Sequence, residues 1–199
     1  MGAGILPTTI HDNKLYFLFG KENQYADTPG WSDIGGGTDD NESFLETAAR
    51  EGMEELTGFL GMERDIKKLL TKYGNYKIDF GEPHRRYRVH IFPMKYDPSL
   101  PVYYNHNHRF LERKLSKNLI KNSKIFEKEE IKWVCEDDIP KMRAQFRHYF
   151  RDVADQIHAE KSDIRAFIRR SNRRKKSTKK KAPASSKKRR RTRRKKQYK

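Results

Sequence analysis

Cysteine is almost absent from this chain, because Cys135 is the single cysteine among its 199 residues. A lone cysteine cannot form an intrachain disulfide, and it argues against a zinc site built on thiolates. Long apolar stretches are missing as well. No run approaches the roughly 18 residues that span a membrane, and no hydrophobic signal-peptide core is visible. The composition therefore predicts a soluble, intracellular protein without a membrane partner.

Acidic residues are absent from the C-terminal end of the sequence. Residues 169–199 contain 19 Lys plus Arg and no Asp or Glu, whereas residues 1–168 contain 26 basic and 27 acidic residues. The formal net charge of +18 is therefore the +19 of the tail minus the −1 of the body. Such a tail has too few apolar residues to offset its ordering entropy. We expect a globular domain at 1–168 and a disordered Lys/Arg-rich tail at 169–199.

The basic runs of the tail are typical of nucleic-acid contacts or of nuclear localisation. A solubilising tail that binds any polyanion is the alternative interpretation. Tyr198 is the single aromatic residue in the tail, so we expect contacts to phosphates and no reading of bases. The candidate nucleic-acid residues are Lys187, Lys188, Arg189, Arg190, Arg191, Arg193 and Arg194.

A glycine-rich segment precedes an acidic helix in the first third of the chain. Gly35–Gly37 allows the backbone to approach a ligand closely. Ser43 and Glu46 have the spacing of a capping box, which predicts that a helix begins there and runs to about Leu56.

Three carboxylates share one face of this predicted helix. Glu51, Glu54 and Glu55 stand at positions i, i+3 and i+4. Beside a glycine loop they would form an oxygen-rich site of the kind that Mg²⁺ or Mn²⁺ prefers. Arg50 can pair with Glu42 and tie the loop to the helix. The alternative is an acidic, solvated helix that follows a flexible turn.

This segment closely resembles the Nudix box, the signature of Nudix hydrolases, which use a divalent metal to cleave nucleoside diphosphates linked to another group. Two positions depart from the family pattern. Gly52 stands where an aliphatic residue is usual, and Gly58 comes one residue late, after Thr57. Both lie outside the carboxylate face. The resemblance extends over nearly all of residues 1–168. More specifically, the sequence looks like the Nudix enzymes encoded by large DNA viruses, some of which remove mRNA caps.

The remaining sequence pattern indicates an α/β protein. Mixed strands around helical segments suit the Nudix fold, an α/β/α sandwich with a mixed sheet. Residues 97–128 are harder to assign, although 109–119 has a helical pattern. We expect a hairpin at 5–10 and 14–19, strands at 76–80, 86–95 and 130–134, and helices at 44–56, 65–73, 109–119 and 141–168.

The resemblance also implies roles for individual residues. Glu51, Glu54 and Glu55 would hold the metal together with a backbone carbonyl at Gly36. Nudix enzymes often recruit one further carboxylate, for which Glu129 and Glu130 are the candidates; a charged start of a strand is the alternative. The candidate catalytic residues are thus Arg50, Glu54, Glu55, Glu129 and Glu130.

Substrate contacts are expected from basic and aromatic residues outside the box. Arg85, Arg86 and Arg88 could meet phosphates, while Tyr103 and Tyr104 could stack a base. A solvated strand face or loop is the alternative for each of them.

Three functions remain open at this point. The first is hydrolysis of a diphosphate linkage in a nucleotide substrate, with an RNA 5′ cap as the leading candidate and the tail holding the RNA. The second keeps the chemistry but acts on free nucleotides, nucleotide sugars or diphosphoinositol phosphates. The third is a catalytically inert nucleic-acid-binding protein. We expect the protein in the cytoplasm or nucleus of a host cell, or associated with a virion.

Overall fold

The computed structural model describes residues 1–181 of the chain, apart from residues 24–25, 73 and 123–126. Its centre is a hairpin of β1 (Gly2–His11) and β2 (Lys14–Glu22), as the sequence predicts, although both strands are longer than expected. Asp12 and Asn13 form the two-residue turn with φ of 45° and 61°. This left-handed pair suits the twist of a hairpin and is tolerated by Asp and Asn.

The sheet around this hairpin is mixed. Strand β1 is parallel to β6 and antiparallel to β2 and β4. The strand order is β3-β2-β1-β6-β5, while β4 pairs with β1 and β7 pairs with β2. The further strands are β3 (Trp31–Ser32), β4 (Ile34–Gly37), β5 (Tyr76–Phe80), β6 (Tyr87–Pro93) and β7 (Lys128–Cys135).

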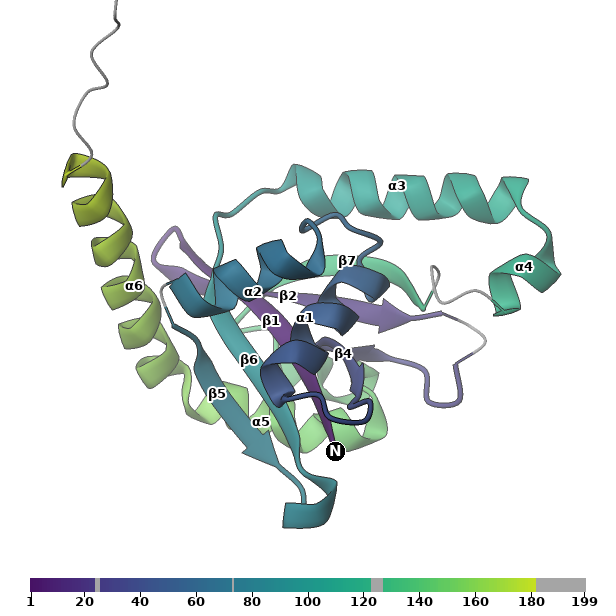
Figure 1. Cartoon of the computed structure of the whole chain (residues 1–199), viewed down its shortest axis with the longest axis horizontal. Helices are drawn as coiled ribbons and strands as arrows, with labels where there is room; N and C mark the ends of the chain where they lie inside the picture. Colours follow the sequence, from purple (N-terminus) through teal and green to yellow (C-terminus); the bar gives the residue numbers. More distant parts are fainter. Residues whose placement is uncertain (24–25, 73, 123–126, 182–199) are drawn as a thin grey trace, which may run out of the picture.

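Helices cover both faces of the sheet (Figure 1). One core cluster joins the sheet to α1, α2 and α3, and the other joins it to α5 and α6. The predicted α/β/α sandwich is therefore confirmed. The helices are α1 (Phe44–Glu55), α2 (Glu63–Lys72), α3 (Ser99–Lys114), α4 (Lys117–Asn122), α5 (Arg151–Ala159) and α6 (Lys161–Lys181), with short 3₁₀ turns at Pro83–Arg85, Pro140–Gln145 and His148–Phe150.

Helix α1 has a defined cap at each end. The expected capping box is present, because the Ser43 hydroxyl accepts from the Glu46 N–H and the Glu46 carboxylate accepts from the Ser43 N–H. At the other end, Thr57 N–H donates to Glu54 C=O and Gly58 N–H donates to Met53 C=O. This is the bonding pattern of a Schellman motif. Thr57 therefore occupies the left-handed position, with φ of 48°.

Close packing between α1 and β1 explains why residue 52 is a glycine. A β-carbon at this position would lie 2.6 Å from Cδ1 of Ile5 in the central strand. Glycine lets helix α1 approach β1 closely where β1 carries a branched side chain. The two departures from the family pattern, at residues 52 and 57–58, thus have local explanations in helix packing and in the C-terminal cap of α1.

Helix α3 is the first difference from the predicted elements. It spans Ser99–Lys114, although only residues 109–119 are expected to be helical. Pro101 hides this helix in the sequence. It lies in the first turn, where a missing N–H breaks no intrahelical hydrogen bond.

The single helix expected at 141–168 is wrong. The backbone leaves helical geometry at Phe146, where ψ is 149°. Phe146 bridges to Trp31, and the Arg147 N–H donates to the Trp31 carbonyl at 2.9 Å. This pairing with β3 competes with helix formation and divides the segment into 3₁₀ turns, α5 and α6.

The expected domain boundary after Ile168 falls inside helix α6, which continues to Lys181. Ser171, three residues beyond that boundary, is buried. Residues 182–199, which include every predicted nucleic-acid residue of the tail, lie outside the described residues. Within the part that is described, no helix combines the length and the apolar composition needed to cross a membrane.

Thr57→Gly is expected to increase the free energy of unfolding by about 0.5–1 kcal/mol, because glycine removes the left-handed strain at a modest entropic cost. Gly58→Ala should act in the opposite direction, since Gly58 has φ of 76°. Urea denaturation of both variants measures this. A Thr57→Gly variant less stable than wild type would contradict the Schellman assignment.

Candidate active site

The glycine strand β4 forms a wall against helix α1. Gly36 pairs with Ala3 of β1, and the space beside its α-carbon is filled by the carboxyl group of Glu51. A β-carbon at Gly36 would lie 2.7 Å from Cδ and Oε1 of Glu51. Any side chain here would therefore push the Glu51 carboxylate out of position.

Arg50 connects this wall to the acidic helix face. Its guanidinium forms a two-point pair with Glu42, with Nε–Oε1 at 2.8 Å and Nη2–Oε2 at 3.0 Å. It also donates to the Gly37 carbonyl at 2.8 Å and to Glu51 Oε1 at 2.7 Å. The hydrogen bond from Arg50 lowers the pKa of Glu42 to about 2. The expected Glu42–Arg50 pair is present and stays ionised at neutral pH.

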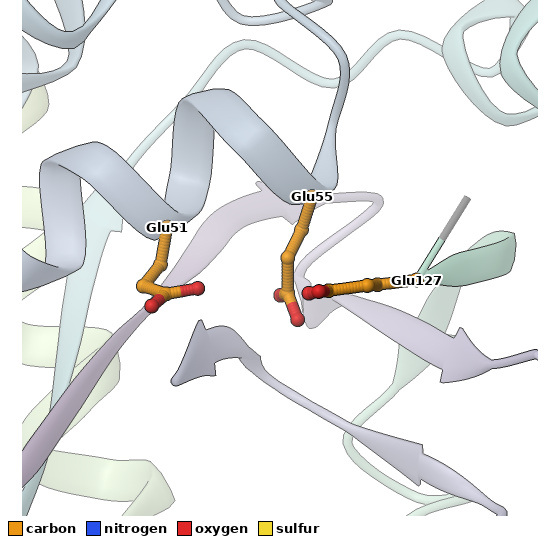
Figure 2. Close-up of side chains that lie close together, drawn as sticks. All are labelled: Glu51, Glu55 and Glu127. Carbon is orange, nitrogen blue, oxygen red and sulfur yellow. The ribbon is translucent and has the colours of Figure 1, made fainter. Parts of the chain in front are cut away.

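Three carboxylates converge beside Gly36. Figure 2 shows Glu51 and Glu55 pointing from successive turns of α1 toward Glu127, which lies just before β7. One oxygen of each lies within 4.8 Å of the others. Three carboxylates at this spacing repel one another unless a cation lies between or beside them.

A buried lysine lies on the inner side of this cluster. The Lys128 ammonium, which is fully buried, lies 3.1 Å from Glu55 Oε1 and contacts Glu22 Oε1. Its third partner is the Ser32 hydroxyl at 3.3 Å. Burial alone lowers the pKa of Lys128, but Glu55 and Glu22 reverse this effect and raise it. Lys128 is thus a permanent cation inside the domain.

The cluster fits a divalent cation. Glu55 Oε2 is buried without a hydrogen-bond partner among the described residues. Burial raises the pKa of Glu55, although Lys128 opposes it, and burial also raises the pKa of Glu51. Since the donors are carboxylate oxygens alone, Mg²⁺ or Mn²⁺ matches their chemistry. Lys128 uses one oxygen of Glu55 and leaves the other for the cation.

A cavity of about 360 Å³ adjoins the glycine wall. Two arginines and two tyrosines line it, and the Arg147 guanidinium carbon lies 4.9 Å from the centre of the Tyr149 ring. Arg147 is held by Glu22 and by the Thr28 hydroxyl. The residues that line the cavity are Met1, Gly2, Gly35, Gly36, Gly37, Arg85, Tyr87, Arg147 and Tyr149.

Comparison with known proteins identifies this arrangement. The family described as the NUDIX domain matches residues 2–153, about three quarters of the chain. The chain belongs to the Nudix family. It is a Nudix-type pyrophosphohydrolase, which acts on substrates linked through a nucleoside diphosphate. No curated protein sequence matches it significantly.

Solved structures share the fold at low sequence identity. The Nudix hydrolase RenU from M. smegmatis is 13% identical, with a TM-score of 0.50 over 82% of this chain and 86% of that chain. A bifunctional NMN adenylyltransferase/ADP ribose pyrophosphatase from Francisella tularensis, complexed with AMP and a Mn ion, is 16% identical. Its TM-score is 0.51 over 80% of this chain and 41% of that chain.

The Nudix box carboxylates separate into two groups. Glu51 and Glu55 lie in the cluster, whereas Glu54 lies beside Arg50, with its Oε2 3.4 Å from Arg50 Nη1. The Gly36 backbone lies against Glu51. The predicted metal set of Glu51, Glu54, Glu55 and Gly36 is thus brought together only in part.

The candidates outside the box lie elsewhere. Glu129 pairs with Lys21 at 2.6 Å, and Glu129 and Glu130 both line a hollow beside Asn105 and Arg109 of α3. The carboxylate that reaches the cluster is Glu127.

A strand irregularity separates Glu129 and Glu130 from the cluster that Glu127 joins. Strand β7 pairs Lys21 with Glu130 and Glu22 with Lys128, so Glu129 is an extra residue. This bulge alters the alternation of side chains that would otherwise separate the two faces. Lys128, Glu22 and Arg147 were also missed. The sequence feature that could have identified Lys128 is a basic residue beside a run of acidic residues at the start of a strand.

The predicted substrate residues have different surroundings. Tyr104 is 2% exposed, and its hydroxyl lies 2.8 Å from the carbonyls of both Glu55 and Lys128, so the prediction that it stacks a base is wrong. Arg88 forms a two-point pair with Asp79 at 2.6 and 2.7 Å. Arg85 lines the cavity, and Arg86 is half-buried. Tyr103 is exposed on α3.

Gly36→Ala is expected to lower the affinity for Mn²⁺ by at least about tenfold, because the new methyl group displaces Glu51. Gly37→Ala is the matched control, since a β-carbon there meets no atom within 4 Å. Electron paramagnetic resonance titration of free Mn²⁺ measures both. Equal Mn²⁺ affinity in the two variants would exclude Glu51 as a ligand.

Lys128→Met is expected to reduce the free energy of unfolding by about 3–5 kcal/mol, because Glu55 loses its buried cation and Glu22 keeps only Arg147. Lys132→Met on the same strand is the control, since Lys132 is exposed. Chemical denaturation at neutral pH measures both. A loss below about 1 kcal/mol, the value of an exposed ion pair, would show that Lys128 is not essential to the packing of the site.

Proposed function

We propose that this Nudix hydrolase removes the 5′ cap of RNA by cleaving a diphosphate linkage in the cap. The observation that carries the proposal is the cavity that shares Gly36 with the carboxylate cluster. A phosphate held at the cluster would extend over the glycine wall, and its nucleoside would enter the cavity. There the aromatic rings of Tyr87 and Tyr149 and the charges of Arg85 and Arg147 suit a base and its phosphates.

The cluster would hold the cation through Glu51, Glu55 and Glu127. When bound, Mg²⁺ or Mn²⁺ would neutralise phosphate oxygens and increase the acidity of a nearby water. Arg50 keeps Glu51 in place through its 2.7 Å bond while Glu42 fixes Arg50 in turn. The protein thus supplies a preorganised set of oxygens whose orientation does not depend on the substrate.

Hydrolysis also requires a proton acceptor. We assign this role to Glu54, which lies one helical turn from Arg50 and outside the metal cluster. Water attacks one phosphorus atom and the P–O bond to the bridging oxygen breaks. That oxygen leaves with the other phosphate, so the three phosphates of a cap divide as two on one product and one on the other. The proton of the attacking water passes to Glu54. Glu129 and Glu130 have less support in this role because they lie beside α3.

A capped RNA is favoured over a free nucleotide by the distribution of charge. The 19 Lys and Arg after Ile168 have no acidic partner in their own segment. Neutralising many phosphates releases counterions, which strengthens binding to a polymer far more than to a substrate with two phosphates. The resemblance to viral Nudix enzymes that remove caps supports the same substrate.

Glu55→Gln and Glu127→Gln are each expected to lower kcat on capped RNA by at least about two orders of magnitude, because a neutral amide keeps the shape but loses the charge. Glu130→Gln is the matched control on β7 and should stay within about threefold. Initial rates at saturating Mg²⁺ or Mn²⁺ measure this. Unchanged turnover in Glu127→Gln would assign the site to other carboxylates.

A substrate panel tests the RNA cap itself. Capped RNA, free cap analogue, ADP-ribose and a diphosphoinositol phosphate are compared by kcat/KM at low and physiological salt. The proposal requires that capped RNA has the highest kcat/KM and the steepest salt dependence. A small diphosphate with higher kcat/KM than capped RNA at both salt concentrations would replace it as the substrate.

A further inference from the structure

Helix α3 is fixed on its inner side to the elements that carry the metal ligands. Tyr104 reaches the carbonyls of Glu55 at the end of α1 and of Lys128 at the start of β7. Asn105 makes two hydrogen bonds to the Ile131 backbone, at 2.9 and 3.2 Å. Figure 1 shows α3 lying along the end of the domain above α1 and β7. The position of α3 is therefore fixed relative to the end of α1 and the start of β7.

The outer side of α3 exposes large aromatic side chains. Tyr103 is 66% exposed and Phe110 is 51% exposed. They stand at i and i+7, so they lie on one stripe of the helix, opposite the buried Tyr104 and His108. Exposed His106 stands between them on the same stripe. Unpaired bases stack on aromatic rings arranged in this way.

Cations accompany these rings. Residues 99–122 contain five Lys plus Arg and one acidic residue, Glu112. Arg109 and Arg113 each donate from Nε to the carbonyl one turn earlier, at 3.1 and 3.2 Å, which orients their guanidinium groups along the helix. Within the described ranges, no carboxylate lies at ion-pair distance from Arg109, Arg113 or Lys114.

These cations also line a hollow on the helix surface. His106, Arg109, Glu112 and Arg113 surround a volume of about 520 Å³. A neighbouring protein chain with an apolar face would have to bury guanidinium groups that have no carboxylate partner among the described residues, which costs free energy. A polyanion with exposed rings of its own satisfies both the charges and the aromatic surfaces. The charge therefore favours an unpaired nucleic-acid strand as the occupant.

We propose that the outer face of α3 binds a single-stranded segment of the RNA body. Its bases stack on Tyr103 and Phe110, while Arg109, Arg113 and Lys114 meet its phosphates. The proposal deepens the proposed function, because it places the RNA that follows the cap on a helix anchored to the metal site. The contacts carry no reading of sequence, so binding depends on unpaired bases and not on their order.

The test uses the full-length chain and an uncapped, 5′-labelled single-stranded RNA. Tyr103→Ala/Phe110→Ala is expected to weaken its binding by at least about tenfold, because two stacking platforms are lost. The same variant should bind a duplex RNA of equal length within about twofold of wild type, since paired bases cannot stack on side chains. Fluorescence anisotropy at a fixed salt concentration measures both affinities.

A charge variant and matched controls separate the contributions. Arg113→Glu/Lys114→Glu should weaken both RNAs and reduce the slope of affinity against salt. Arg64→Glu/Lys68→Glu on α2 and Met62→Ala, which change exposed residues elsewhere, should leave the difference between single-stranded and duplex RNA unchanged. To check that each variant is folded, its kcat/KM is measured on the small diphosphate that the wild-type protein hydrolyses best. A value equal to that of the wild type shows that the fold is intact.

Three results would overturn the proposal. The first is an aromatic variant with wild-type affinity for single-stranded RNA, and the second is an equal loss of affinity for the duplex. The third is an aromatic variant that loses self-association in sedimentation, which would identify a second copy of the chain as the occupant. Because uncapped RNA is not hydrolysed, loss of binding in the aromatic variant supports the inference even if capped RNA proves to be a poor substrate.

Discussion

The contact of Lys128 with Glu55 and Glu22 is the interaction on which the site depends. It joins three elements, β7, α1 and β2, at a point where all three side chains are buried. Without this cation, burial would favour the protonated form of Glu55, which binds a divalent metal poorly. Lys128 therefore allows Glu55 to be both buried and charged. The same ion pairs fix the position of β7, and with it the position of Glu127.

Arg50 balances the cluster from the opposite side. Lys128 acts from within the core, whereas Arg50 lies between the glycine wall and the exposed end of the helix face. Each cation takes one carboxylate of the cluster and leaves an oxygen for a metal. The net charge of the three glutamates is thus partly compensated before any metal binds. With fewer positive charges nearby, the three carboxylates would repel one another. With more positive charges, the carboxylates would be neutralised and would no longer bind a metal cation.

The sequence predicts the parts of the structure that local rules determine. The hairpin, the capping box, the Glu42–Arg50 pair and the α/β/α sandwich follow from turn residues, spacing and periodicity. The missed features depend on contacts between distant residues. Phe146 leaves the predicted helix to pair with Trp31, and the bulge at Glu129 brings Glu127 to the metal cluster. Tyr104 was misassigned because its partners are backbone carbonyls, which have no signature in a sequence.

The anchoring of α3 has a consequence for specificity. Tyr104 contacts the carbonyls of Glu55 and Lys128 together, so a shift of α3 would alter both the metal ligand and its buried counterion. The outer face of α3 lies on the far side of the helix from Tyr104, so it is held in a fixed position relative to the cluster. A long RNA and a small diphosphate would use the same cluster, but only the RNA would reach the outer face. Substrate preference in this family member would then reside in helix α3, while the box supplies the chemistry common to all substrates.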